Sequence, residues 1–229
     1  MVKYDLDQIT HDDILNGKML LVDKPLKWTS FDVVKYIRKS LVSKFKIKRI
    51  KVGHAGTLDP LATGLLIICI GKQTKKISEY QNQLKTYTGK FKLGETTPSF
   101  DGETEVNEVF NYDHIKELDL KNMSEQFIGK KMQKPPIFSA IKKDGKRMYE
   151  YARENKKIEI QEREIQIHEF NITNFSSPYV EFHIKCSKGT YIRSIANDYG
   201  KKLNSGSYLF ELRRVNIGDY SVLNALKIE

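Results

Sequence analysis

One carboxylate stands in a glycine-rich segment that leads into an apolar run. Residues 53–71 read GHAGTLDPLATGLLIICIG, and Asp59 is the single acid among them. An Asp before a Pro is typical of a turn in which the carboxylate bonds nearby main-chain amides. A carboxylate can instead act as a nucleophile or a general base. For that role it needs partner side chains, which this segment alone does not supply.

Three other residues could complete such a site. Arg193 lies in a predicted helix, and a guanidinium beside Asp59 would keep the carboxylate ionised and fix its orientation. Tyr87 lies in a predicted strand, and a tyrosine ring can stack on a nucleobase. His54 is either a second wall of the site or an ordinary loop residue. The sequence does not show that these four residues meet.

No pattern predicts a metal site or an organic cofactor. Residues 11–13 (HDD) are of metal-ligand type, but a helix cap or solvated turn is the simpler interpretation. Cys69 and Cys186 form no C-x-x-C pair, and we expect two reduced, packed thiols. Residues 53–57 lack the G-K-[ST] of a P-loop. Residues 189–190 (GT) open a predicted helix, where an ordinary cap or a bound phosphate fits equally well.

The positive charge is clustered. The formal net charge is +10 and the pI is about 9.3. Either a solvated lysine-rich face or a polyanionic partner such as nucleic acid accounts for this charge. One run without any acid holds Lys35, Arg38, Lys39, Lys44, Lys46, Lys48, Arg49 and Lys51, and a second cluster holds Lys130, Lys131, Lys134, Lys142, Lys143, Lys146 and Arg147.

The hydrophobic pattern predicts interspersed strands and helices. Because several strands follow one another, we expect an α+β fold with a mixed or antiparallel sheet, not a doubly wound parallel one. Residues 65–70 are either a buried strand or a buried helical turn. The other expected elements are strands at 18–25, 84–93, within 157–188, at 208–215 and at 220–222, helices from Thr29 or Ser30, at 113–128, at 148–155 and from Thr190, a hairpin turn at 143–146 and a turn-rich loop at 94–102.

Several motifs, in order along nearly the whole chain, resemble one known family, the tRNA pseudouridine-55 synthases of the TruB type. The segment around Asp59 looks like the nucleophile motif of that family. The motifs that carry the resemblance are LVDKP (21–25) with WTS (28–30), GHAGTLDPLATG (53–64), KTY (85–87) with LG (93–94), PPIFSAIK (135–142) through GKR (145–147) with Tyr149, Ala152 and Arg153, KGTYIRS (188–194) and LRR (212–214).

The resemblance implies an isomerisation that needs neither cofactor nor metal. A uridine at position 55 of the tRNA T loop would be flipped out, detached from C1′, turned and rejoined through C5. Asp59 would be the nucleophile, Arg193 would hold it charged and aimed, and Tyr87 would stack on the flipped base and move a proton. His54 would hold the RNA loop open. The other implied residues are Tyr191, Leu212 and Lys24 around the substrate, and Lys142, Lys146 and Arg147 in the RNA grip.

The resemblance also sets expectations about domains and partners. We expect one catalytic domain over residues 1–229, with an RNA-gripping insertion at about 130–156. Many members carry a small C-terminal RNA-binding domain of the PUA type, which is expected to be missing here. The loop at 94–102 is shorter than the commonest form, and Asp101 is aligned with an aspartate of the family. We expect a monomer without an obligatory protein partner.

Two other functions stay open at this stage. An RNA chaperone or binding module without turnover would share the basic face, although binding alone does not need a carboxylate that faces phosphates. A guide-RNA-dependent synthase of the same superfamily would also match around Asp59, but normally needs the extra C-terminal domain. No stretch has the order of a signal peptide or the length of a membrane span, so a cytoplasmic protein is expected.

Overall fold

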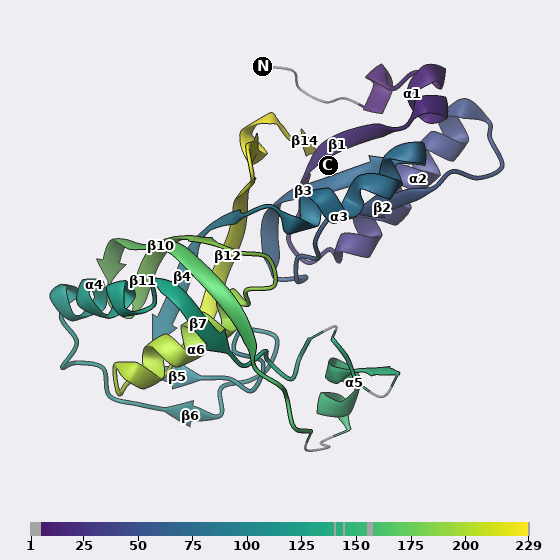
Figure 1. Cartoon of the computed structure of the whole chain (residues 1–229). Helices are drawn as coiled ribbons and strands as arrows, with labels where there is room; N and C mark the ends of the chain where they lie inside the picture. The colour runs from purple at the N-terminus through teal and green to yellow at the C-terminus, as the bar shows by residue number, and fades with distance from the viewer. Residues whose placement is uncertain (1–5, 140, 144, 155–157, 229) are drawn as a thin grey trace. The chain divides into compact units, whose positions relative to one another are not determined.

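The computed structural model describes residues 6–139, 141–143, 145–154 and 158–228, and Figure 1 shows their elements. They divide into two compact units: unit 1 comprises Met1–Thr88 and Leu212–Glu229, and unit 2 comprises Gly89–Glu211. The chain passes between the units within two strands, β4 (Lys85–Leu93) and β12 (Ser207–Ile217). The expected single catalytic domain over 1–229 therefore stays a prediction.

Unit 1 is built on a mixed sheet. Within it the strand order is β14-β1-β3-β12, with β2 paired to β3 and β13 paired to β12. The β1–β3 pair is antiparallel, whereas β12 runs parallel to β3. Its elements are η1 (Leu6–Gln8), α1 (His11–Asn16), β1 (Lys18–Lys24), α2 (Ser30–Phe45), β2 (Val52–His54), β3 (Ala62–Ile70), η2 (Gly71–Lys76), α3 (Ile77–Asn82), β13 (Tyr220–Ser221), η3 (Val222–Asn224) and β14 (Leu226–Lys227).

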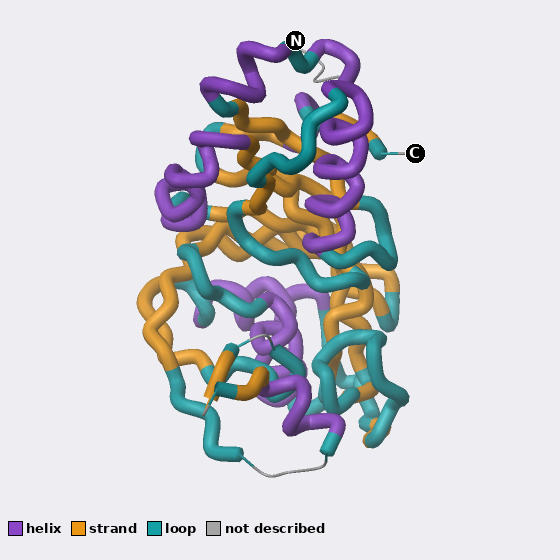
Figure 2. The backbone as a smooth tube through the Cα atoms, turned by 90° about the vertical axis from the view of Figure 1, so that its right-hand side faces the viewer, coloured by secondary structure: helices purple, strands orange, loops and turns teal. Residues whose placement is uncertain are grey.

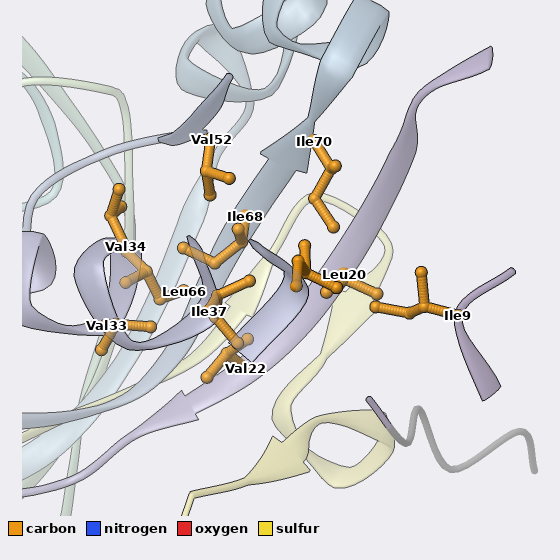
Figure 3. Packing of buried hydrophobic residues seen from close by; sticks show 11 residues of the cluster. Ile9, Leu20, Val22, Val33, Val34, Ile37, Val52, Leu66, Ile68 and Ile70 are labelled. Carbon is orange, nitrogen blue, oxygen red and sulfur yellow. The ribbon is translucent and has the colours of Figure 1, made fainter. Parts of the chain in front are cut away.

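The apolar run before Gly71 is a strand, β3, which is buried on both faces. Leu66, Ile68 and Ile70 point toward α2 and join one core cluster, shown in Figure 3. Leu65 and Ile67 belong to a second cluster on the opposite face. A strand covered on both sides has no polar face, so its sequence is continuously apolar. This explains why the sequence alone left strand and helix open.

Helix α2 begins where the sequence predicts it. Thr29 is the N-cap, and Asp32 N–H donates to the Thr29 hydroxyl at 3.0 Å. The carboxylate of Asp32 in turn accepts from the Thr29 main-chain N–H at 3.0 Å. This capping box satisfies two main-chain donors at the helix start. Val33 and Ile37 then lie on the face that packs against β3.

Unit 2 also combines a sheet with helices, as Figure 2 shows for the whole chain. Its strand order is β4-β11-β10-β7, and α4 packs against β10 and α6. Tyr199 of α6 contacts the rings of Phe91 and Phe170 at the centre of this unit. Its elements are β5 (Glu95–Thr96), β6 (Glu108–Val109), α4 (Glu117–Gln126), β7 (Gly129–Gln133), β8 (Lys142–Lys143), β9 (Lys146–Arg147), α5 (Met148–Arg153), β10 (Arg163–Ser176), β11 (Tyr179–Cys186) and α6 (Ile192–Lys202).

The expected α+β fold is confirmed, and so is the turn at 143–146, because β8 and β9 pair as a hairpin. Asp144 within that turn lies outside the described residues. Cys69 and Cys186 are both buried, as expected of packed thiols. Residues 11–13 form the first turn of α1, and the Asp13 carboxylate accepts from the Thr10 main-chain N–H at 3.0 Å.

Three predicted boundaries are wrong. Ile158 and Ile160 lie before β10, which begins at Arg163, so their alternation marks no strand. The helix predicted at 113–128 is shorter, because α4 covers only Glu117–Gln126. Thr190 does not cap α6: its hydroxyl donates back to the Ser187 carbonyl at 3.0 Å, and Tyr191 occupies the N-cap position. No helix among the described residues is long and apolar enough to cross a membrane.

At Gly64 the backbone of β12 lies very close to β3, and a substitution there tests this packing. Its φ is +105°, and a Cβ there would lie 2.3 Å from the Arg214 carbonyl oxygen. We expect Gly64→Ala to lower the free energy of unfolding by about 3 kcal/mol, from the positive φ and the clash together. Urea denaturation measures this loss.

Gly129→Ala is the matched control for this measurement. Gly129 has a similar φ of +101°, but a Cβ there would meet nothing within 4 Å. Gly129→Ala should therefore lower the free energy of unfolding by about 1–2 kcal/mol, from the backbone conformation alone. Equal losses in the two variants would show that the approach of β12 to β3 contributes nothing at Gly64.

Candidate active site around Asp59

The segment that carries Asp59 is not a flexible loop. It connects β2 to β3, which pair antiparallel with His54 opposite Ile68. Ala55 N–H donates to the Ile67 carbonyl at 2.8 Å, and Ala62 N–H donates to the Asp59 carbonyl at 3.0 Å. Both ends of the connection are thus fixed to β3, and Asp59 itself is half-buried.

Ser30 holds the residue next to Asp59. The Ser30 hydroxyl accepts from Leu58 N–H at 2.8 Å and donates to the Leu58 carbonyl at 3.1 Å. Ser30 and Leu58 are both buried. A single side chain therefore satisfies both main-chain polar groups of Leu58, which fixes the backbone immediately before Asp59. Ser30 is the first residue of α2, so the capped end of that helix positions this hydroxyl.

Arg214 holds the same segment from the opposite strand. Its side chain is 1 % exposed and belongs to β12, where Arg214 pairs with Gly64. The guanidinium donates to the carbonyls of Leu65 at 2.7 Å, Gly56 at 3.0 Å and Thr57 at 3.5 Å. Such charge-assisted hydrogen bonds are stronger than neutral ones. The sequence placed Arg214 in the LRR motif, but nothing in its spacing indicated that it is buried.

Lys24 is a second buried cation near Asp59. Its ammonium donates to the carbonyls of Trp28 at 2.6 Å, Pro25 at 2.9 Å and Pro60 at 3.4 Å. Burial lowers the pKa of Lys24 to about 8, and the negative charge of Asp59 acts in the opposite direction. The described contacts of Lys24 are with main-chain carbonyls, and its substrate contact stays a prediction.

The other predicted residues of unit 1 lie on β12, β4 and β2. Leu212 pairs with Ala62 in the β12–β3 register and is half-buried. Tyr87 is a buried residue of β4. His54 ends β2; burial lowers its pKa and the nearby positive charge of Arg214 lowers it further. The imidazole is therefore held in its neutral form.

An ion pair that the sequence did not indicate joins β1 to β12. Arg213 donates to both carboxylate oxygens of Asp23, at 3.0 Å and 2.6 Å. Arg213 also donates to the Thr63 hydroxyl at 3.3 Å. This bidentate geometry fixes both side chains. The motifs LVDKP and LRR thus meet through Asp23 and Arg213, a contact visible only after folding.

Arg193 lies in unit 2, in the first turn of α6. Its Nη1 donates to the carbonyls of Phe138 at 2.9 Å and Ser99 at 3.2 Å. Its Nε lies 3.5 Å from Asp101 Oδ2, and both side chains are almost fully buried. The predicted pair with Asp59 joins the two units and stays a prediction.

Tyr191 and the predicted RNA-contacting residues also belong to unit 2. Tyr191 is half-buried and directly precedes α6. Lys146 forms an ion pair with Glu154, and the guanidinium of Arg147 lies 6.0 Å from the centre of the Tyr149 ring. The main chain of Lys142 pairs with that of Arg147. The side chain of Lys142 lies outside the part of the chain that the structure describes.

Residues 42–192 match the model of the TruB family pseudouridylate synthases, N-terminal domain. The chain belongs to the TruB family. A tRNA pseudouridine synthase B of Flavobacterium johnsoniae is 56 % identical over 221 residues, which is 96 % of each protein. The enzyme of the same name from Chloroherpeton thalassium is 51 % identical over 211 residues, 92 % of this chain and 87 % of that one. The family resemblance inferred from the motifs is confirmed.

Solved structures share the fold at lower identity. One chain of a Cbf5–Nop10–Gar1 complex superposes on 99 % of this chain with a TM-score of 0.69 and 22 % identity. The match spans 55 % of that longer chain. A chain of an H/ACA ribonucleoprotein bound to a substrate RNA that contains 2′-deoxyuridine gives a TM-score of 0.68 at 19 % identity. The TruB-family fold is therefore shared with these larger proteins.

The hydrogen bonds between Ser30 and Leu58 should contribute measurably to the free energy of unfolding. We expect Ser30→Ala to lower the free energy of unfolding by about 1–3 kcal/mol, because it leaves the buried N–H of Leu58 without its acceptor. Ser40→Ala is the control on the same helix, since the Ser40 hydroxyl donates only to the Tyr36 carbonyl. Its loss should stay within about 0.5 kcal/mol in urea denaturation. Equal losses would contradict the role assigned to Ser30.

The lowered pKa of Lys24 predicts a dependence of stability on pH. The ordinary lysine pKa is 10.5, and the folded value is about 8. Between these two pH values the unfolded chain binds more protons, so the contribution of Lys24 to the free energy of unfolding rises with pH. It is lost again as the pH falls through about 8.

Lys24→Met isolates this contribution. Urea denaturation of both proteins from pH 7.5 to 10.5 gives the difference in their free energies of unfolding, in which the other titrating groups cancel. We expect the free energy of unfolding of the wild type to rise relative to that of Lys24→Met as the pH rises. A difference that does not change with pH would show that Lys24 keeps its ordinary pKa in the folded protein.

Proposed function

We propose that this chain isomerises a uridine of tRNA, at position 55 in the T loop, to pseudouridine, with Asp59 as the nucleophile. One observation carries the proposal: the backbone on either side of Asp59 is fixed by Ser30, Arg214 and Lys24 in a chain of the TruB family. A nucleophile contributes most when its geometry is set before the substrate arrives. The relatives named tRNA pseudouridine synthase B supply the substrate class.

The reaction needs no atom from outside the substrate. The bond from N1 of the base to C1′ breaks, the base turns, and a bond from C5 to C1′ forms. The proton leaves C5 to a general base and N1 gains a proton, so the product is an isomer of the substrate. A carboxylate that attacks C1′ or C6 of the pyrimidine divides this exchange into two easier steps. Asp59 is the carboxylate we assign to this attack.

The surrounding residues would support this attack in distinct ways. The positive charge of Lys24 would attract the Asp59 carboxylate. Arg193 would orient the same carboxylate when RNA is bound, and Tyr87 would stack on the flipped base. A neutral His54 would insert its flat, uncharged ring into the RNA loop and hold the loop open.

The hairpin β8–β9 and helix α5 would grip the RNA in this proposal. Tyr149 lies within cation–π distance of two arginines, Arg147 at 6.0 Å and Arg153 at 5.4 Å. Aromatic rings beside cations are typical of surfaces that stack bases and neutralise phosphates. Lys142 and Lys146 add positive charge to the same hairpin. The protein would act on free tRNA in the cytoplasm as a monomer.

Asp59→Asn tests the proposed function. We expect the wild type to release tritium from C5-labelled uridine in a tRNA transcript, because joining C1′ to C5 expels that hydrogen. The variant should bind the same tRNA with an unchanged Kd but lose at least about 10³-fold in rate, since an amide cannot act as the nucleophile.

Asp219→Asn is the matched control, because Asp219 is an exposed carboxylate of the same unit outside the proposed site. It should release tritium at the wild-type rate. Turnover retained by Asp59→Asn would remove Asp59 as the nucleophile. Tight tRNA binding without release by the wild type would favour an RNA chaperone, or a synthase that depends on a guide RNA.

A further inference from the structure

Gln133 fixes the main chain of Tyr191. It ends strand β7 and is 4 % exposed. Its side-chain oxygen accepts from Tyr191 N–H at 2.8 Å, and its amide nitrogen donates to the Tyr191 carbonyl at 3.0 Å. Nearby, the Ser194 hydroxyl donates to the Lys134 carbonyl at 2.8 Å. The end of β7 therefore holds the start of α6 at Tyr191 and again at Ser194.

Arg163 contacts the ring of the same tyrosine. It is the first residue of β10 and pairs with Gln133 in the β10–β7 register. Its guanidinium carbon lies 4.8 Å from the centre of the Tyr191 ring, within cation–π range. Gly189 has a φ of +79°, and a Cβ there would lie 3.5 Å from Arg163 Nη1. The guanidinium thus lies against the turn that leads into Tyr191.

Arg163 is half-buried, and its hydrogen bonding is unusual for an arginine whose head group is partly enclosed. Its Nε and Nη2 atoms are buried and have no hydrogen-bond partner in the part of the chain that the structure describes. Arg193 also has a buried Nε without a hydrogen-bond partner among the described residues, but its Nη1 donates to two carbonyls. A buried donor without an acceptor costs free energy. Stability therefore gives no reason for an arginine at position 163, whereas its contact with the Tyr191 ring does.

We propose that Gln133 and Arg163 are positioning residues that hold Tyr191 in place for the flipped uridine. The inference rests on the proposed function and on the expectation, from the family resemblance, that Tyr191 lies around the substrate uridine. A tyrosine at the N-cap of a helix has freedom in its main chain and in its two side-chain torsions. Gln133 removes the main-chain freedom of Tyr191, and the flat guanidinium of Arg163 restricts its side-chain torsions. The ring is then set before the RNA binds, which favours the reaction step more than binding.

Single-turnover kinetics test this role in the full chain. With the wild type active on a tRNA transcript, we expect Arg163→Gln to lower the rate at saturating enzyme about tenfold, with less than about a twofold change in the Kd for tRNA. Arg163→Lys keeps a cation over the ring and should recover most of the rate. Glu164→Gln, on the same strand and at an exposed ion pair with Lys130, is the control and should match the wild type.

A double-mutant cycle shows whether Arg163 acts through Tyr191. In a Tyr191→Leu background, Arg163→Gln should have no further effect on the rate, because the ring that it holds is gone. Gln133→Ala leaves Arg163 intact and should also lower the rate at an unchanged Kd. It is the variant to use if thermal denaturation shows that Arg163→Gln does not fold.

The alternatives give different results. An unchanged rate in Arg163→Gln and Gln133→Ala, or the same loss with and without the Tyr191 ring, would overturn the proposal. A weaker Kd at an unchanged saturating rate would also overturn it, because Arg163 would then contact RNA phosphate directly. An inactive wild type would instead count against the proposed function itself.

Discussion

The guanidinium of Arg214 lies inside unit 1 and donates to the main-chain carbonyls of Gly56 and Thr57, in the segment that carries Asp59, and to that of Leu65 in β3. A covalent mechanism needs the nucleophile at a fixed position, and a glycine-containing connection has little stiffness of its own. The stiffness comes from outside the segment, from Arg214 on one strand and Ser30 on one helix. The sheet register, the helix cap and the close approach at Gly64 are all arranged so that these two side chains reach the same short stretch of backbone.

Burying cations for this purpose has a physical cost. Removing a guanidinium or an ammonium from water is unfavourable unless its donors find good acceptors. Arg214 and Lys24 meet this cost with main-chain carbonyls. A carbonyl carries only a partial negative charge, so each cation keeps most of its positive field. The charge of Lys24 attracts the Asp59 carboxylate, and the charge of Arg214 lowers the pKa of His54.

In unit 2 the same principle acts on an aromatic ring. Gln133 satisfies both main-chain polar groups of Tyr191, and the guanidinium of Arg163 lies over the ring, while its Nε and Nη2 have no hydrogen-bond partner among the described residues. Buried donors without acceptors cost stability. Such departures from good packing are expected where a protein positions groups for chemistry.

The sequence by itself determined the family, the α+β class, the capped start of α2 at Thr29 and the identity of the candidate nucleophile, because these depend on local patterns and on motifs in order. It could not decide between strand and helix for residues 65–70, since burial on both faces removes the alternation. Only the tertiary structure revealed the bidentate pair of Asp23 and Arg213, the grip of Arg214 on Gly56 and Thr57, and the contact of Arg163 with Tyr191. These contacts join residues far apart in the chain, and the residue type alone does not show whether a lysine or arginine is buried or exposed. Which carbonyls and rings surround it is decided by strand order and register, which the local sequence does not encode.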